Sequence, residues 1–308
     1  MKFVDFIAMG RINVDFYPHE MNVPFNEIIS FKKSIGGSPA NIAVGAARLG
    51  VNTGFIGKVS DDVFGAYILD FFQKEMIDTS QIGIDKTGAV NCIAFTEVKS
   101  PENCSAIIYR DNVADLKIEP NDISEEYIKN AKILLISGTA LSKSPSREAV
   151  FTALTYAKKH NTIIYFDLDY RANAWSVPDE ATAYYQKAAE YCDVIIGTKE
   201  EMDILKNDYI KKVALVIVKQ GKNGSVAYLK DGTIIKSPVF PVQIKKTYGA
   251  GDAYAAALIF GILQNWELQK CLKYAAAAAS IVISRTACAE SSPYLKEITD
   301  FISKGEWV

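Results

Sequence analysis

Short apolar runs alternate with amphipathic helical segments along most of the chain, and this rhythm limits the fold more than any other feature. Apolar runs suited to buried strands occupy residues 3–9, 133–137, 162–167, 193–196 and 215–219. Segments with helical periodicity lie between them, at 146–159 and 181–191. Continuous apolar strands separated by helices are typical of a mostly parallel sheet covered on both faces. The sequence therefore predicts an α/β fold with a mostly parallel central sheet flanked by helices.

Two segments, about 12–35 and 88–116, break this rhythm with alternating or irregular patterns. We interpret them as a small β-rich lid inserted into the domain. Within the 308 residues, no internal repeat, low-complexity segment or linker divides the chain. The simplest organisation is a single domain over 1–308 that carries the lid. Ligands bind beyond the carboxyl ends of the strands in such sheets, so the residues after each apolar run are the ones to examine.

Charge and residue usage argue against several classes of function. The net charge is −2 and no long basic run is present, which disfavours nucleic acid or an anionic membrane as partner. The only histidines, His19 and His160, lie far apart, so a zinc site or a Ser-His-Asp triad has little support. The five cysteines are odd in number and scattered, and the N-terminal segment lacks the pattern of a signal peptide. These features predict a cytoplasmic protein.

The segment KKTYGAGDAYAAALIFGIL carries the strongest chemical signal. Gly249, Ala250 and Gly251 form a turn of low bulk directly before a helix of small and apolar residues. Backbone N–H groups at such a helix start can bind an anion, and Asp252 stands beside that place. Phosphoryl transfer needs this kind of positioning and charge neutralisation. The simpler alternative is an acid that only stabilises the start of its own helix.

A second glycine-containing segment, GGSPANIAVGAARLG, covers residues 36–50. Ser38 suits the N-cap and Pro39 the first helical position, which predicts a helix start. In the structural interpretation, this is a capped core helix after a flexible turn. In the functional one, Gly36 and Gly37 let a polyol approach the backbone, and Asn41 hydrogen-bonds to it.

These two segments resemble the two signatures of the ribokinase-like carbohydrate kinases, the PfkB family. They occur in the family's order, and the resemblance covers essentially the whole chain. It implies a ribokinase-like fold, with ATP as phosphoryl donor and Mg²⁺ as cofactor. It also implies that Asp252 is the catalytic base and that Gly249, Ala250 and Gly251 form the anion hole. Four residues are implied as sugar contacts: Asp15 in GRINVD, Gly36, Gly37 and Asn41.

The resemblance also implies a nucleotide site. Lys219, Gly221 and Gly224 in VKQGKNGS fall where the family binds nucleotide phosphates and ribose. Taken alone, this segment is a glycine-containing hairpin between two strands. For Ala278, Ser280 and Ser284, lining of the adenine pocket and core packing of an Ala-rich helix stay open as alternatives.

Thr198 and Lys246 depart from the family pattern, as does Asp169, which replaces the Asn of D-x-N-x-R before the matching Arg171. Thr198 to Glu201 read as a capping box, where the family usually has Asn-x-x-Glu in its magnesium–phosphate network. Glu201 matches that pattern and Thr198 departs from it, so the resemblance implies a tentative, indirect magnesium role for Glu201 alone. Lys246 stands where many members carry an aspartate, which in ribokinase helps to hold a monovalent cation. That departure puts a monovalent cation site in doubt.

Several stretches look like the branch of the family that phosphorylates 5-dehydro-2-deoxygluconate in myo-inositol breakdown: SPSREAVFTALTYAKKH, FDLDYR, CDVIIGTKEE and ASIVISR. IIYRDNVADL is similar to the 2-keto-3-deoxygluconate kinases. Both substrates carry a carboxylate, which suits Arg110 and Arg171 as bidentate partners. For Arg171, the alternative is a salt bridge with Asp167 or Asp169.

The expected activity is therefore ATP-dependent phosphorylation of the terminal hydroxyl of a small sugar acid. The first candidate is 5-dehydro-2-deoxygluconate, converted to its 6-phosphate. A 2-keto-3-deoxygluconate kinase and a fructokinase-like enzyme are the alternatives, and a non-catalytic sugar-sensing protein is a remote one. A homodimer stays open.

Overall fold

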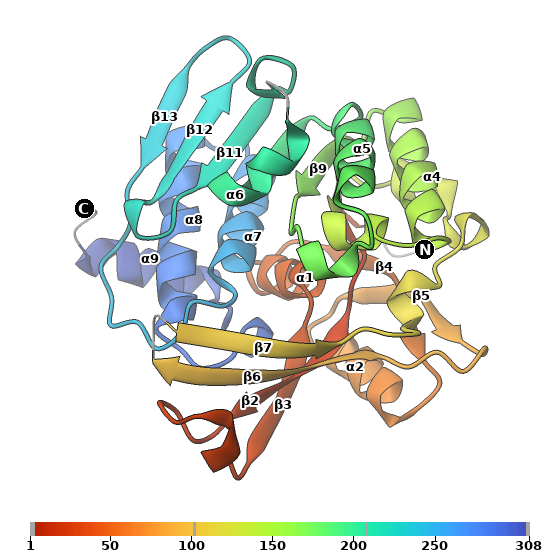
Figure 1. Ribbon diagram of the computed structural model, residues 1–308. Helices are drawn as coiled ribbons and strands as arrows, with labels where there is room; N and C mark the ends of the chain where they lie inside the picture. The colour runs from red at the N-terminus through yellow and green to blue at the C-terminus, as the bar shows by residue number, and fades with distance from the viewer. Residues whose placement is uncertain (1–3, 101–102, 207–208, 306–308) are drawn as a thin grey trace.

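The computed structural model describes residues 4–100, 103–206 and 209–305, and a nine-stranded sheet forms their centre (Figure 1). The strand order is β13 (Ile234–Ser237), β12 (Ser225–Leu229), β11 (Leu215–Lys219), β10 (Val194–Thr198), β9 (Ile163–Asp167), β8 (Ile133–Ser137), β1 (Phe6–Met9), β4 (Thr53–Ser60), β5 (Asp78–Asp85). In this spatial order, all neighbours between β11 and β5 pair in parallel, and β12 and β13 add antiparallel pairs at one edge. The prediction of a mostly parallel sheet is confirmed.

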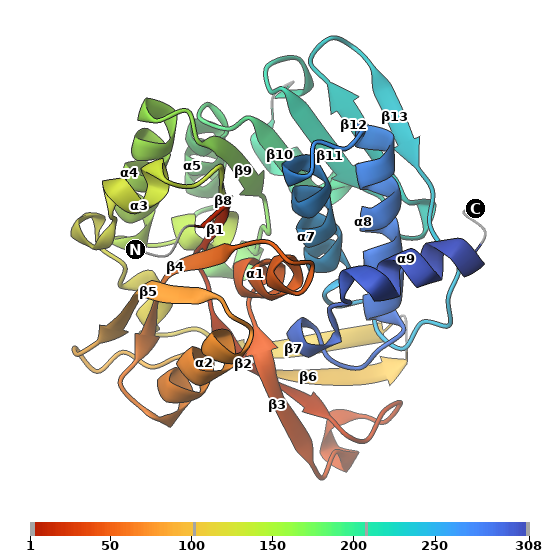
Figure 2. The same ribbon diagram turned by 180° about the vertical axis from the view of Figure 1, so that it is seen from behind.

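Helices cover both faces of this sheet because its strands are apolar on both sides. In β1, Phe6 and Ala8 point into one core, and Ile7 and Met9 point into the other. The first core contains α1 (Ser38–Arg48), α2 (Val63–Lys74), α7 (Ala250–Leu263), α8 (Leu268–Ile283) and α9 (Leu295–Lys304), as Figure 2 shows. The second contains α3 (Glu125–Lys129), α4 (Ser146–Lys159), α5 (Pro178–Ala189) and α6 (Lys199–Met202).

The predicted elements lie close to the observed ones. The strands expected at 133–137 and 215–219 and the helix expected at 146–159 have the expected bounds. The helix expected at 181–191 begins three residues earlier, because Pro178 suits the first turn of a helix. Residue 3 of the first predicted strand lies outside the described residues.

A second, smaller sheet of four strands lies at the bottom of Figure 1. Its order is β3 (Phe31–Gly36), β2 (Asn13–Pro18), β6 (Cys92–Ser100), β7 (Asn103–Tyr109). These strands fall in the two segments that break the helical rhythm, so the predicted small β-rich part is confirmed. Its action as a lid stays a prediction. Across the described ranges, none of the helices combines the length and apolarity needed to cross a bilayer.

Candidate active site

The turn before α7 brings the GAGD segment to the carboxyl ends of the sheet strands. Gly249 is the N-cap of α7 with φ 79°, a left-handed conformation that a side chain disfavours. A Cβ there would also lie 2.9 Å from Cys288 Sγ. Asp252 consequently sits in the first turn of α7, as the sequence predicts.

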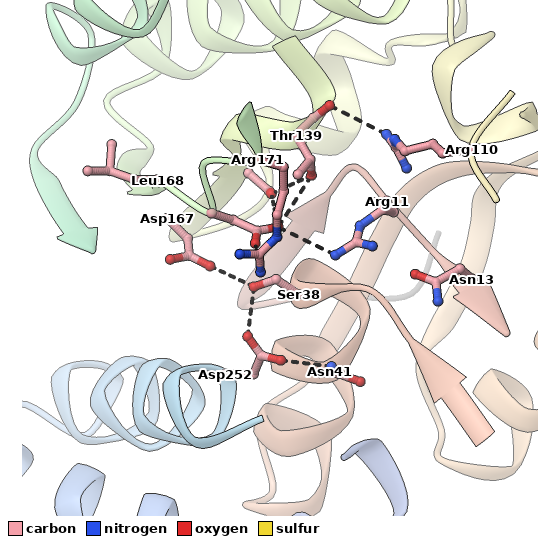
Figure 3. Close-up of polar contacts among 12 residues, drawn as sticks. Arg11, Asn13, Ser38, Asn41, Arg110, Thr139, Asp167, Leu168, Arg171 and Asp252 are labelled. Atoms are coloured by element: carbon pink, nitrogen blue, oxygen red, sulfur yellow. Dashed lines mark hydrogen bonds and ion pairs between the residues drawn. The ribbon is translucent and has the colours of Figure 1, made fainter. Parts of the chain in front are cut away.

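The Asp252 carboxylate faces α1 (Figure 3). Its Oδ1 lies 2.8 Å from Ser38 Oγ, and its Oδ2 accepts a hydrogen bond of 2.7 Å from Asn41 Nδ2. Burial, followed by the nearby charge of Asp167, raises the pKa of Asp252 to about 6. A carboxylate with a pKa near neutrality is well matched to accept a proton from a hydroxyl during catalysis.

Ser38 is not the N-cap of α1, and that prediction is wrong. The N-cap is Gly37, Ser38 is the first helical residue, and Pro39 is the second. The Ser38 hydroxyl instead lies 2.6 Å from Asp167 Oδ2 and 2.8 Å from Asp252 Oδ1. The Ser38 hydroxyl thus contacts two carboxylates that are distant in the sequence, and it does not cap the helix.

Gly36 makes room for polar side chains of the neighbouring strand. A Cβ on Gly36 would lie 2.2 Å from Asp15 Oδ1, and one on Gly37 would lie 2.5 Å from the Arg11 carbonyl oxygen. Asp15 accepts hydrogen bonds from the Asn13 amide and from the Tyr17 hydroxyl. Burial raises the pKa of Asp15 to about 6. The glycines therefore allow β2 and β3 to hold Asp15 close to the start of α1.

Lys219 joins the Asp252 cluster from the end of β11. Its Nζ lies 3.5 Å from Asp167 Oδ1, and a Cβ on Gly251 would lie 3.0 Å from the same Nζ. Burial alone would lower the pKa of Lys219, but Asp167, Glu201 and Asp252 raise it overall. A charged ammonium group therefore stands beside the predicted anion hole.

The remaining predicted nucleotide residues lie in two places. Gly221 and Gly224 form the turn between antiparallel β11 and β12, so the hairpin interpretation of this segment is confirmed. Ala278 and Ser280 are buried in α8, where the Ser280 hydroxyl donates to the Phe240 carbonyl oxygen at 2.9 Å. Ser284 caps the end of α8 and donates to the Ile281 carbonyl oxygen at 2.7 Å.

Glu201 forms the predicted capping box with Thr198. Its Oε2 accepts from the Thr198 N–H at 2.7 Å, and Thr198 Oγ1 accepts from the Glu201 N–H at 3.2 Å. Burial raises the pKa of Glu201, although Lys219 opposes that shift. Since Oε1 takes no part in the capping box, Glu201 retains an oxygen suited to a water molecule on a hard cation.

A cavity of about 230 Å³ opens where β7 meets the loops after β1, β8 and β9. Three guanidinium groups line it, those of Arg11, Arg110 and Arg171, together with Lys143 and Asp111. Figure 3 shows Arg11 and Arg171 directed toward the same space, near Ser38 and Asp167. Thus the predicted residues Arg110 and Arg171 are brought together, and Arg11 joins them.

Two carboxylates partly neutralise the three guanidinium groups. Arg171 Nη2 lies 2.6 Å from Asp169 Oδ1, and Arg11 Nη2 lies 3.7 Å from Asp169 Oδ2. Arg110 Nη2 lies 2.6 Å from Asp115 Oδ2. Within the described residues, Arg11 Nε and Arg110 Nε and Nη1 are buried without a hydrogen-bond partner. The cavity thus keeps an excess of positive charge and of unused N–H donors, which suits an anionic ligand.

Asp169 holds an unusual backbone conformation at this site. Its φ is 34°, in the left-handed region that residues other than glycine seldom adopt. This conformation lets one carboxylate reach both Arg11 and Arg171. Strain of this kind is often found where a loop positions functional groups.

Four residues of the site escaped the sequence analysis: Arg11, Asn13, Ser38 as a carboxylate partner, and Asp167 as a member of the Asp252 cluster. Arg11 follows the first apolar run, and Asp167 ends another. Because ligands bind beyond the carboxyl ends of the strands in such sheets, both positions could have been selected from the sequence. Asn13 lies within the GRINVD segment beside Asp15. Ser38 alone carried no such signal.

The fold and the site together are those of a carbohydrate kinase. The chain belongs to the PfkB family: the pattern of the pfkB family carbohydrate kinases matches residues 5–295. It is 51% identical to the 5-dehydro-2-deoxygluconokinase of Geobacillus kaustophilus (strain HTA426), over 98% of this chain and 95% of that protein. The 5-dehydro-2-deoxygluconokinase of Bacillus anthracis (strain CDC 684 / NRRL 3495) is 49% identical, over 98% of this chain and 96% of that protein.

Among solved structures, the chain is similar to an uncharacterized sugar kinase from Pyrococcus horikoshii in complex with ATP. The TM-score is 0.85 at 29% identity, and the match covers 97% of this chain and 99% of that one. The predictions of a ribokinase-like fold and of a PfkB-family kinase are confirmed.

Proposed function

We propose that this chain is an ATP-dependent kinase that phosphorylates the terminal hydroxyl of 5-dehydro-2-deoxygluconate to give the 6-phosphate. Relatives about half identical over nearly the whole chain carry the name of that activity. The observation that carries the proposal is the convergence of three guanidinium groups on one cavity near Asp252.

This convergence favours an acid over a neutral sugar. Bringing guanidinium groups near a neutral ligand costs hydration that the ligand cannot replace. A carboxylate offsets that cost and can accept paired hydrogen bonds from a planar guanidinium. Holding the acid end in this way would leave the far end of a six-carbon chain to approach Asp252.

Asp252 would accept the proton of the terminal hydroxyl as its oxygen attacks the γ-phosphorus. Its pKa of about 6 leaves it ionised at neutral pH. The backbone N–H groups at the start of α7 and the Lys219 ammonium would stabilise the negative charge of the transferring group. Asp15, Gly36, Gly37 and Asn41 would orient the hydroxyl-bearing part of the sugar.

ATP would lie beside Lys219, Gly221 and Gly224, with its adenine toward Ala278, Ser280 and Ser284. Mg²⁺ supplies charge neutralisation on the phosphate oxygens when it is bound. Across the described residues, no cluster of three or more histidine, cysteine, aspartate or glutamate side chains is arranged to hold a metal. Mg²⁺ would enter with the nucleotide, and the Glu201 carboxylate would hold one of its water molecules.

A panel of acceptors tests the proposal. With MgATP, kcat/KM is measured for 5-dehydro-2-deoxygluconate, 2-keto-3-deoxygluconate, fructose and ribose, and the product is identified by mass spectrometry and NMR. The first acid should be preferred and should yield a 6-phosphate. A preference for either neutral sugar, or phosphorylation at another hydroxyl, would overturn the proposal.

A further inference from the structure

Guanidinium groups bind phosphate as well as carboxylate, so the three arginines alone do not determine which anion the cavity takes. At pH 8 a carboxylate carries one negative charge, and a terminal phosphate carries about two. Both groups are small compared with a cavity of about 230 Å³, so its size does not separate them. The charge of the surrounding side chains is therefore the property that can distinguish the two anions.

Asp169 contacts two of the three arginines. Its Oδ1 lies 2.6 Å from Arg171 Nη2, and its Oδ2 lies 3.7 Å from Arg11 Nη2. The hydroxyl oxygens of Ser137 and Thr139 lie 3.3 Å and 3.4 Å from the same Oδ2. Only 3% of the Asp169 side chain is exposed, so solvent and salt screen its charge weakly. Any anion that binds to Arg11 and Arg171 therefore experiences the charge of Asp169 as well.

Among the described residues, the ion pairs that join the cavity arginines to carboxylates leave one positive charge unmatched. Arg110 pairs with Asp115 at 2.6 Å, and Asp169 is the common partner of the other two guanidinium groups. Three cations thus face two anions, and a single carboxylate would balance the difference. A phosphate would bring a further negative charge into a site that already holds Asp115 and Asp169, at a cost in binding free energy.

Lys143, Asp111 and Asp15 do not add to this positive charge. Lys143 and Asp111 also line the cavity, but both are exposed and their charges are opposite. Asp15 acts on Arg11 from β2 and reduces the surplus of positive charge further. The buried N–H groups of Arg11 and Arg110 that lack a partner within the described residues can still donate to a ligand. The cavity thus offers several donors but little net charge.

We propose that Asp169 determines the specificity of the arginine cavity, so that the cavity accepts one carboxylate and disfavours a phosphate. This inference rests on the proposed recognition of an acid, and it adds which anions are kept out. Exclusion of phosphate matters in a kinase, because ATP and the phosphorylated product would otherwise compete for the same arginines. Asp169 acts through Arg11 and Arg171, and it is therefore a positioning residue.

The conformation of Asp169 permits a substitution that alters charge and little else. Its φ of 34° lies in the left-handed region, which asparagine adopts about as readily as aspartate. Asp169→Asn removes one negative charge and keeps a side-chain oxygen that can accept from Arg171. A change in anion preference in this variant can therefore be assigned to charge.

Gluconate and glucitol 6-phosphate are suitable probes, because they are open six-carbon chains with the same number of hydroxyl groups and differ in the terminal anion. Their Kd values are measured by calorimetric titration of the nucleotide-free enzyme at pH 8 and constant ionic strength. The unsubstituted enzyme should bind gluconate more tightly than glucitol 6-phosphate, by about tenfold or more. In Asp169→Asn, the Kd for glucitol 6-phosphate should fall by about tenfold or more, and the preference for gluconate should disappear.

Two further variants locate the effect. Asp5→Asn removes an equal charge at the amino end of β1, where Asp5 pairs with Lys132 at 2.8 Å, and it should leave both Kd values unchanged. Asp169→Asn/Arg171→Ala should lose the tighter binding of glucitol 6-phosphate, because the phosphate then lacks a guanidinium partner. This second result separates binding in the cavity from binding at the start of α7.

An unchanged preference for gluconate in Asp169→Asn would overturn the inference, and so would tighter phosphate binding that persists without Arg171. Neither result would affect the proposed activity, which the acceptor panel decides separately. A phosphate preference in the unsubstituted enzyme, or no measurable binding of gluconate, would contradict both the inference and the recognition of an acid.

Discussion

Asp252 differs from a common helix-start acid in its contacts and in its pKa. Acids in the first turn of a helix usually interact with the helix dipole and stay ionised at low pH. Here the carboxylate contacts Ser38 and Asn41 of another helix, and burial raises its pKa to about 6. The geometry therefore supports the catalytic interpretation over simple stabilisation of α7.

Replacing Asp252 by asparagine separates these two interpretations. Asp252→Asn should lower kcat by about 10²–10⁴-fold, the usual effect of removing a general base, with little change in the Kd for ATP. Steady-state kinetics and calorimetric titration with ATP measure the two quantities.

Asp62→Asn is the matched control, because Asp62 is the N-cap of α2 and asparagine caps helices equally well. This variant should keep its kcat. A near-normal kcat in Asp252→Asn would rule out Asp252 as the base.

The residues that sequence analysis could not predict are those whose partners are distant in the chain. The glycine turn and Asp252 form one local motif, so their arrangement was predictable. Ser38 looks like a helix cap, and only the fold reveals that Asp167 and Asp252, far along the sequence, lie within hydrogen-bond distance. For Arg171, both alternatives have support: it pairs with Asp169 and also lines the cavity.

At the scale of elements, fully buried strands were the easiest to predict. β8 and β11 are continuous apolar runs, because both faces of the sheet are covered, and their bounds match the prediction. The conformation of the short link before α7, residues 246–248, was harder to predict, because it depends on a buried lysine. Lys246 is fully buried, and its Nζ donates to the Tyr248 carbonyl oxygen, next to the glycine turn.

We expect the Lys246 ammonium to hold this link without a monovalent cation. Turnover should be the same in potassium, sodium and tetramethylammonium chloride. Lys246→Met, of similar length, should lower kcat by about tenfold, because Tyr248 loses a charged donor. Lys245→Met, at the exposed neighbouring position, should not. A strong requirement for potassium in the unsubstituted enzyme would contradict this role.

At the scale of the whole molecule, the two sheets meet around the site. The large sheet supplies Asp167 and Lys219, and the small sheet supplies Asp15 and leads into Arg110 after β7. The rhythm of the sequence predicted both sheets. The pattern within each segment could not predict how the sheets face each other, because that arrangement depends on packing between distant elements. A homodimer and a cytoplasmic location stay predictions.

The small sheet is expected to close over the acceptor. Hydrogen exchange in β2, β3, β6 and β7 should slow by about tenfold or more when the sugar acid and a non-hydrolysable ATP analogue are bound together, because closure protects a reactive phosphoryl group from water. Amides of α4, one of the helices that cover the large sheet, serve as the control and should change little. Unchanged exchange in all four strands at saturation would show that no closure occurs.

Recognition of a carboxylate by the arginine cavity is the central claim, and one comparison tests it most directly. The values of kcat/KM are measured for 5-dehydro-2-deoxygluconate and for its neutral C1 amide, with the unsubstituted enzyme and with Arg110→Ala/Arg171→Ala. We expect the acid to be preferred by about a hundredfold or more, and the double substitution to reduce that preference to a few-fold. An amide as good as the acid, or a preference that survives both substitutions, would contradict the account.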